Sequence, residues 1–193
     1  MKTIEEYKLH FSLEDNITPV DDTERVIYGL IEEFANDKNS SKFREDVTKI
    51  MVGLRPSEGK LGYDDDFDAI EVKPVNITGK DKLNGKGSFS DLTWARHKKY
   101  IKDNLRMLIS GFQHGKLLFI IEFPYKSIQE RMETLLKKKL PNGDVKNTYV
   151  RAAAFNYVHW KDENFNVKFI RPNIVKYQKV FNKKFFKLLM DNK

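Results

Sequence analysis

The residues best suited to chemistry lie in one short segment, residues 63–75, which reads YDDDFDAIEVKPV. It opens with three adjacent carboxylates, Asp64, Asp65 and Asp66. It ends in an apolar run that contains Glu71 and Lys73. Side chains two residues apart in a strand lie on the same face of a sheet. A strand here would therefore set Glu71 beside Lys73 and turn the intervening apolar side chains toward a packed interior.

A carboxylate and an ammonium group held together behind an acidic cluster suit phosphodiester hydrolysis. Two carboxylates can hold a hard divalent cation through their oxygen atoms. The cation polarises a phosphoryl oxygen and lowers the pKa of a bound water. A nearby lysine orients that water or offsets charge in the transition state. The pattern predicts a hydrolytic site that uses Mg²⁺, for which Mn²⁺ can substitute.

The segment resembles the signature of the PD-(D/E)XK nucleases, a superfamily that includes many type II restriction endonucleases. That signature is an acid, a variable gap and then acid-x-lysine on a strand, and the resemblance covers residues 64–73. It implies that Glu71 and Lys73 take the second-acid and lysine positions. It also implies that the first acid is Asp64 or Asp66, so that the metal ligands come from Asp64, Asp66 and Glu71.

The chain departs from the signature in three ways: no proline precedes the aspartates, three of them are adjacent, and the gap to Glu71 is short, which requires a tight hairpin. The first-acid position therefore stays open among neighbouring carboxylates, with Asp65, Asp68 and Glu58 as further candidates. An acid on the first expected helix, Glu32 or Glu33, is a candidate for a supporting role. The alternative for Glu71 and Lys73 is a surface salt bridge, which commonly contributes about 0–1 kcal/mol.

The segment after the expected strand, residues 76–90, is rich in glycine, lysine, asparagine and serine and predicts a long loop. Long loops in compact domains are often functional. Lysines can neutralise phosphates, and amide, hydroxyl or guanidinium groups can reach base edges. The candidate DNA contacts, in the loop and at the start of the next helix, are Lys80, Lys82, Asn84, Lys86, Ser88, Arg96 and Lys98. The alternative is a solvated loop beside a basic helix face.

Hydrophobic spacing predicts the elements that would position these residues. Helices are expected over residues 22–34, 43–54, about 91–110, 127–139 and 175–190, and strands over 60–63, 67–75, 116–125, 149–160 and 165–171. The order of elements predicts one domain over residues 1–193, an α/β (α+β) fold with a mixed central sheet flanked by helices. The resemblance implies that this fold is restriction-endonuclease-like.

Composition narrows the class of function. The net charge of +7 favours a polyanionic partner. The absence of cysteine excludes disulfides, thiolate nucleophiles and cysteine-ligated zinc. No apolar run approaches the roughly 18 residues that span a membrane, and the first residues carry acids where a signal peptide is apolar. We therefore expect a cytoplasmic protein without a membrane partner.

Together these features predict a metal-dependent endonuclease acting on double-stranded DNA, of the type II restriction class. A homodimer is expected, because two-fold symmetric DNA sites suit two-fold symmetric proteins. Other superfamily activities, such as a resolvase or a nickase, stay open. The alternative from another class is an inactive nuclease fold that serves only as a DNA-binding or assembly module.

Overall fold

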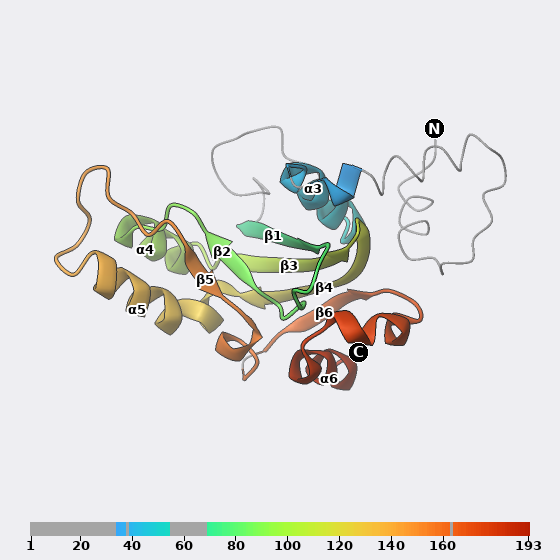
Figure 1. Ribbon diagram of the computed structural model, residues 1–193. Coiled ribbons are helices and arrows are strands. Elements are labelled where there is room, and N and C mark those ends of the chain that lie inside the picture. The colour runs from blue at the N-terminus through green and yellow to red at the C-terminus, as the bar shows by residue number, and fades with distance from the viewer. Residues whose placement is uncertain (1–33, 38, 55–68, 163) are drawn as a thin grey trace.

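The computed structural model describes residues 34–37, 39–54, 69–162 and 164–193, and over these residues the fold is α+β (Figure 1). A four-stranded mixed sheet carries helices on both faces, beside a second sheet of two strands. This confirms the predicted fold class. The elements are α3 (Ser41–Met51), β1 (Ile70–Ile77), β2 (Gly87–Phe89), α4 (Trp94–Lys102), β3 (Arg106–Gln113), β4 (Lys116–Pro124), the 3-10 helix η1 (Tyr125–Ile128), α5 (Gln129–Lys139), β5 (Ala153–Phe155), η2 (Tyr157–His159), β6 (Asn166–Ile170), η3 (Ile174–Val180) and α6 (Lys183–Asp191).

The main sheet has the strand order β1-β3-β4-β6. Strands β1 and β3 are parallel, in a register that sets Ile70 opposite Arg106 and Lys73 opposite Ile109. Parallel neighbours need a crossover connection, and here β2 and α4 form it. Strand β4 runs antiparallel to both of its neighbours. Its position inside the sheet explains the continuous apolar run of its sequence, which is buried from Leu117 to Phe123.

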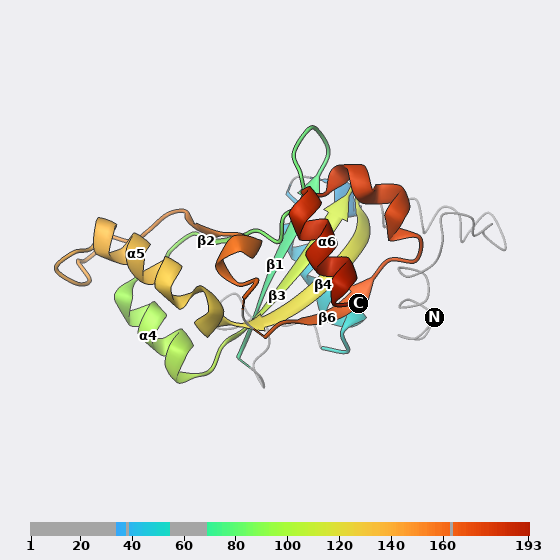
Figure 2. The ribbon, with the colours of Figure 1, turned by 90° about the horizontal axis from the view of Figure 1, so that it is seen from below.

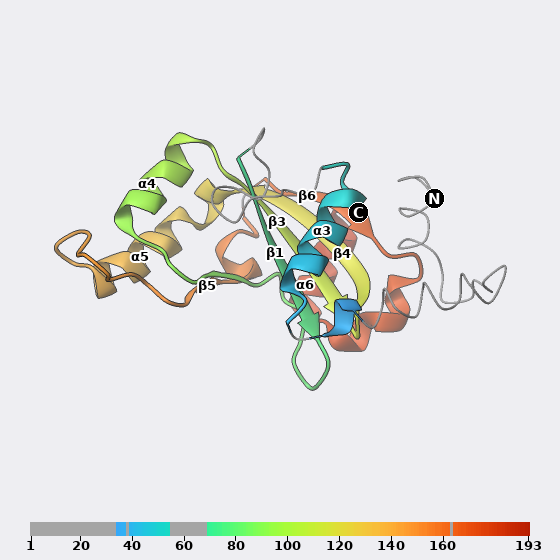
Figure 3. The ribbon, with the colours of Figure 1, turned by 90° about the horizontal axis from the view of Figure 1, so that it is seen from above.

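Two hydrophobic cores lie on opposite faces of this sheet. The smaller one is covered by α3, which crosses the face as Figure 3 shows, and contains Val47, Ile70, Val72, Leu108, Phe112, Leu117 and Ile120. The larger one lies between the other face and the remaining elements, with α6 against the sheet and α4 and α5 to one side (Figure 2). There Trp160 stacks on Phe123, with ring centroids 4.9 Å apart.

Strand β1 divides its side chains between the two cores. Ile70 and Val72 belong to the α3 side, whereas Val75 and Ile77 pack on the larger core. By the period of two, Glu71 and Lys73 face the same side as Val75, toward β2. In the described part of the chain β1 is an end strand of its sheet. Its polar side chains therefore lie at an accessible margin of the fold.

Several sequence-based elements are confirmed with small shifts in their ends: α3, β1, β4, α5 and β6. The long helix expected over residues 91–110 is wrong. Helix α4 ends at Lys102, and Asn104 adopts a left-handed backbone with φ of 50°. That conformation commonly ends a helix. The apolar residues that follow then alternate across β3, with Leu108 and Ile109 in different cores.

Three other expectations need correction. The loop over residues 76–90 contains the end of β1, the short strand β2 and a bridge from Leu83 to Phe181. The strand over 149–160 is reduced to β5, after which Asn156 caps η2. The final helix is interrupted at Asn182, whose side chain accepts hydrogen bonds from two backbone amides at the start of α6. The elements expected before residue 34 and over residues 60–66 lie outside the described residues.

The close contact between β3 and β4 generates a stability prediction. Gly111 lies opposite Phe119, and a Cβ at position 111 would overlap the Phe119 ring. We expect Gly111→Ala to lower the free energy of unfolding by about 1–3 kcal/mol, the usual cost of overpacking. Urea unfolding measures it. Gly79→Ala is the control, because nothing lies within 4 Å of a Cβ there; equal stability of the two variants would contradict the prediction.

Candidate active site

Glu71 and Lys73 form an ion pair on β1. The Lys73 ammonium donates a hydrogen bond to Oε1 of Glu71. The Glu71 side chain is only 16% exposed and the Lys73 side chain only 23% exposed. The Lys73 ammonium also lies 5.1 Å from the centroid of the Phe89 ring, which comes from β2. Strand geometry and the β2 ring thus hold the two charged groups at a defined place that water only partly reaches.

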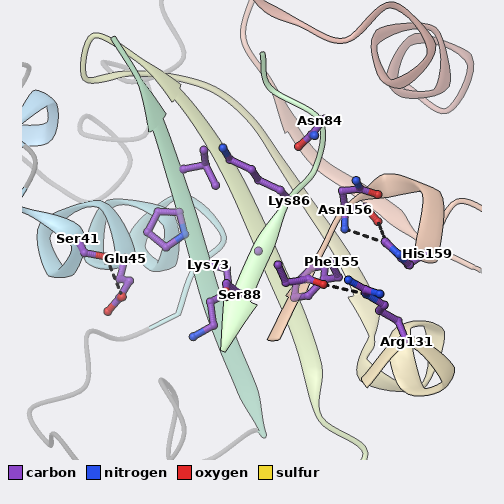
Figure 4. A pocket seen from close by; sticks show the side chains of 14 residues that line it. Ser41, Glu45, Lys73, Asn84, Lys86, Ser88, Arg131, Phe155, Asn156 and His159 are labelled. Carbon is purple, nitrogen blue, oxygen red and sulfur yellow. Dashed lines mark hydrogen bonds between the residues drawn. The ribbon is translucent and has the colours of Figure 1, made fainter. Parts of the chain in front are cut away.

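Lys73 opens onto a cleft of about 540 Å³. Figure 4 shows the side chains that line it, which come from distant parts of the chain, from α3 on one side to α5 on the other. The polar side chains in its lining are Ser41, Glu45, Lys73, Asn84, Lys86, Ser88, Arg131, Asn156 and His159. The cleft therefore forms only when the fold is complete.

The charge of this cleft is predominantly positive. Lys73, Lys86 and Arg131 contribute three cations, and Glu45 is the acidic residue in the lining. Arg131 is held in place because its Nε donates a hydrogen bond of 3.1 Å to the backbone carbonyl of Ala154. A concave surface with an excess of one sign of charge concentrates ligands of the opposite sign. Among the described residues, the three cations outnumber Glu45 and the adjoining Glu71, so the cleft suits a polyanion.

The Asn84 side chain has unused hydrogen-bonding capacity. Its Oδ1 is buried and has no hydrogen-bond partner in the described part of the chain. The backbone around it is fixed, because the Asn84 carbonyl accepts a hydrogen bond of 3.0 Å from the Tyr157 amide. An unsatisfied buried polar group costs about 1–3 kcal/mol. A ligand group in the cleft that pairs with this amide would recover part of that cost.

The structure brings together some of the sequence-predicted contacts and separates others. Lys73, Asn84, Lys86 and Ser88 line the cleft, and Glu71 adjoins it through its ion pair with Lys73. The remaining four lie outside the lining: Lys80, Lys82, Arg96 and Lys98.

Those four residues have other surroundings. Lys80 is exposed, and Lys82 donates to the Lys179 carbonyl. Arg96 pairs with Asp91, and Lys98 lines a separate hollow beside Trp94. The positive charge of the cleft therefore comes from Lys73 and Lys86, which the sequence predicted, and from Arg131, which it did not.

Only some of the carboxylates that could bind a metal lie within the described residues. Glu71 and Glu45 are the described carboxylates beside Lys73 or in the cleft lining. Within the described ranges, no three His, Cys, Asp or Glu side chains gather as a metal site. The candidate acids outside those ranges are Glu32, Glu33, Glu58, Asp64, Asp65, Asp66 and Asp68. Carboxylate is the donor type that Mg²⁺ prefers, and Glu71 is the described carboxylate of the motif that offers it.

Sequence reasoning missed Glu45, Arg131, Asn156 and His159, which lie far from the motif along the chain. One signal was available for Glu45. It follows Ser41 by four residues, so both lie on one side of α3, and the Ser41 hydroxyl donates to Glu45 Oε1 at 3.4 Å. Nothing in the local sequence marks the other three, because tertiary packing alone brings them to β1.

Comparison with known proteins adds no assignment: no protein-family model matches the chain, and a search of curated proteins finds no match. Among the described residues, no helix combines the length and apolar character needed to cross a membrane.

His97 lies outside the cleft, in the interior. It is 2% exposed, its Nδ1 lies 2.9 Å from the Tyr125 hydroxyl, and its Nε2 lies 3.5 Å from Glu133. Burial lowers the pKa of the imidazole, an effect that Glu133 partly opposes. The folded chain therefore holds His97 neutral to more acidic pH than the unfolded chain does.

This difference predicts a pH-dependent stability. Because the unfolded chain binds the proton more readily, the free energy of unfolding falls as pH drops through the ordinary histidine pKa of about 6.5. His97→Gln removes this contribution. We expect the variant to be less stable than the wild type by about 1–3 kcal/mol at pH 8, and the gap to narrow at pH 5.5.

Urea unfolding at both pH values measures the gap. His114→Asn, at an exposed histidine in the turn after β3, serves as the control for replacing a histidine outside the core. A gap for His97→Gln that is equal at the two pH values would contradict the prediction.

Proposed function

We propose that this chain is a metal-dependent endonuclease that hydrolyses phosphodiester bonds in double-stranded DNA, as a type II restriction enzyme of the PD-(D/E)XK superfamily does. One observation carries the proposal: a glutamate and a lysine share one face of β1, partly buried and ion-paired, where the lysine opens onto a basic cleft. Glu71 and Lys73 are the groups suited to act on a phosphodiester bond, and the cleft is the basic surface suited to hold a polyanion.

The geometry of Glu71 and Lys73 favours this proposal over a simple surface salt bridge. An exposed pair is held by little more than its own weak attraction. Here both side chains are mostly shielded, and Lys73 is also placed over the Phe89 ring. Shielding from water strengthens the electrostatic effect that a fixed cation has on a developing negative charge. Lys73 is thus suited to stabilise the transition state of phosphodiester hydrolysis.

Glu71 would hold the metal together with an aspartate of the acidic run, Asp64 or Asp66. When bound, Mg²⁺ supplies Lewis acidity at the phosphoryl group and an acidified water. The chain's own part is to fix the Glu71 carboxylate on a rigid strand and to keep Lys73 within reach of the substrate phosphate. Mn²⁺ has the same preference for oxygen ligands and would substitute.

The rest of the cleft supports binding of DNA. Lys86 and Arg131 line the same cleft as Lys73, and cations in one cleft can contact phosphates, which supply much of the affinity for DNA. Asn84 and Ser88 add neutral polar groups suited to base edges or sugars. The net charge of +7 would draw DNA to the protein over longer range.

Cleavage of plasmid DNA tests the proposal. We expect the purified wild type with Mg²⁺ to give discrete bands, and EDTA to abolish them. Glu71→Gln and Lys73→Met should each lower the cleavage rate by at least about 100-fold, equivalent to about 2.7 kcal/mol, because the first removes a ligand charge for the metal and the second removes the cation beside the scissile phosphate. Both variants should still bind a labelled duplex.

Matched controls are available elsewhere in the chain. Lys146→Met removes the lysine of another acid-x-Lys triplet, and Asp81→Asn removes an exposed carboxylate; both should cleave as the wild type does. Wild-type protein that binds DNA without cutting it would instead support the binding-module alternative. A smear in place of bands would indicate a nuclease without sequence specificity and would contradict the restriction assignment.

We further propose that the enzyme works as a homodimer, because one active site per chain cuts one strand at a time and two copies are needed for a double-strand break. Light scattering after gel filtration should give about twice the 22.7 kDa chain mass. In the cleavage assay, linear plasmid should appear without a long-lived nicked intermediate. A monomeric mass both with and without a duplex would contradict this expectation.

A further inference from the structure

A second basic groove lies at the far end of α5. It measures about 540 Å³ and is lined by Leu135, Lys138, Lys139, Thr148, Tyr149 and Arg151, among others. Two lysines come from the last turn of the helix, and the aromatic ring and guanidinium come from the segment that precedes β5. We call this the α5 groove. It shares no lining residue with the active-site cleft.

The α5 groove has an excess of positive charge. The described part of its lining contains three cations and no acidic residue. Among the described residues, no ion pair includes Lys138, Lys139 or Arg151, all of which are exposed. The neighbouring Lys137, in contrast, pairs with Glu133 at 3.5 Å. Three exposed charges of one sign around a hollow repel each other, and an anionic ligand would relieve that repulsion.

The helix alone does not account for this arrangement. Lysines in the last turn of a helix interact favourably with its dipole, typically by about 0.3–1 kcal/mol. This interaction alone is sufficient to explain why Lys138 and Lys139 occur at the end of α5. Arg151 belongs to a different segment, so the sequence of the helix does not account for its position in the lining. Its guanidinium instead lies 6.0 Å from the centroid of the Tyr149 ring, itself 36% exposed. Two segments therefore converge to build the groove.

The same two segments connect the groove to the active-site cleft. Arg131 lines the cleft and Lys138 lines the groove, seven residues apart on α5. Seven residues bring the helix back to nearly the same side after about 10 Å. The partner segment runs in the opposite chain direction, from Arg151 in the groove to Phe155 in the cleft, and Figures 1 and 2 show it beside α5.

We propose that the α5 groove binds the sugar-phosphate backbone of the DNA that flanks the cleavage site. This inference rests on the proposed function. Arg131 and Lys138 lie about 10 Å apart along the axis of α5, and a duplex carries one negative charge per about 1.7 Å of its own axis. A duplex seated at Arg131 therefore also offers phosphates to the long side chains of Lys138 and Arg151. Contacts of this kind position DNA and carry no sequence information themselves.

The test uses the full chain with three neutral substitutions, Lys138→Gln, Lys139→Gln and Arg151→Gln. Binding of a fluorescent 30-base-pair duplex is followed by anisotropy in EDTA, over a series of salt concentrations. We expect the variant to bind about tenfold more weakly or worse at 0.1 M salt. The slope of log affinity against log salt should fall by about 2 to 3, since each phosphate contact contributes about 0.9.

The matched control removes three exposed lysines from α6: Lys183→Gln, Lys184→Gln and Lys187→Gln. It makes the same change in net charge and should keep nearly the wild-type slope, because α6 packs on the sheet away from α5 (Figure 1). An equal loss of DNA affinity in both variants would mean that net charge alone causes the effect, and it would overturn the proposal. Circular dichroism confirms that both variants fold.

The remaining outcomes separate this inference from the proposed function. Wild type that cuts DNA, with a groove variant that binds as tightly as wild type, overturns the groove and leaves the nuclease proposal standing. Wild type that neither binds nor cuts DNA overturns both. A groove variant that binds DNA normally but no longer binds polyglutamate would assign the groove to an acidic protein and would also overturn the proposal.

Discussion

The parallel pairing of β1 with β3 is the constraint on which the site depends. Once Val72 is fixed in the α3 core, where it is 0% exposed, the side chains on either side of it must face the opposite way. A shift of one residue would exchange the faces and bury the carboxylate of Glu71 in an apolar core. The cost of burying an unpaired charge is far larger than any local preference. The core thus selects the register, and the register presents the charged pair.

The same constraint explains why the cleft is assembled from distant segments. A parallel partner strand requires a crossover, and the crossover brings β2 and α4 over the face that carries Lys73. Strand β2 contributes Phe89, whose ring lies under the Lys73 ammonium and against Tyr100, Tyr125 and Phe155. Through β5 this aromatic cluster leads to α5 and Arg131. A local motif on one strand is therefore surrounded by groups that the larger core places.

The sequence predicted well what short-range periodicity controls. The alternation of residues 70–73 defined β1 and the common side of Glu71 and Lys73, and the unbroken apolar run of 117–121 defined the buried strand β4. The prediction failed where the spacing of the apolar residues fits a helix and a strand equally well. Leu105, Leu108 and Ile109 have helical spacing, and the turn at Asn104 decides for a strand through a backbone conformation that the apolar pattern does not encode. The break at Asn182 was missed for a related reason, since a capping asparagine within an apolar stretch is a weak local signal.

The site residues divide in the same way, into those that local periodicity identifies and those that only tertiary packing brings to the site. Glu71 and Lys73 were identifiable because their relation is a matter of two positions on one strand. Arg131 and His159 were not, because their approach to Lys73 depends on β5 pairing with β2 and on α5 packing over β5. The two kinds of residue also have different tasks in the proposed enzyme. Groups that act on a reacting phosphate must be held rigidly to one another, and a single strand does this well. Groups that only guide a long, regularly charged substrate need approximate placement over a larger surface, which helices and connecting segments provide.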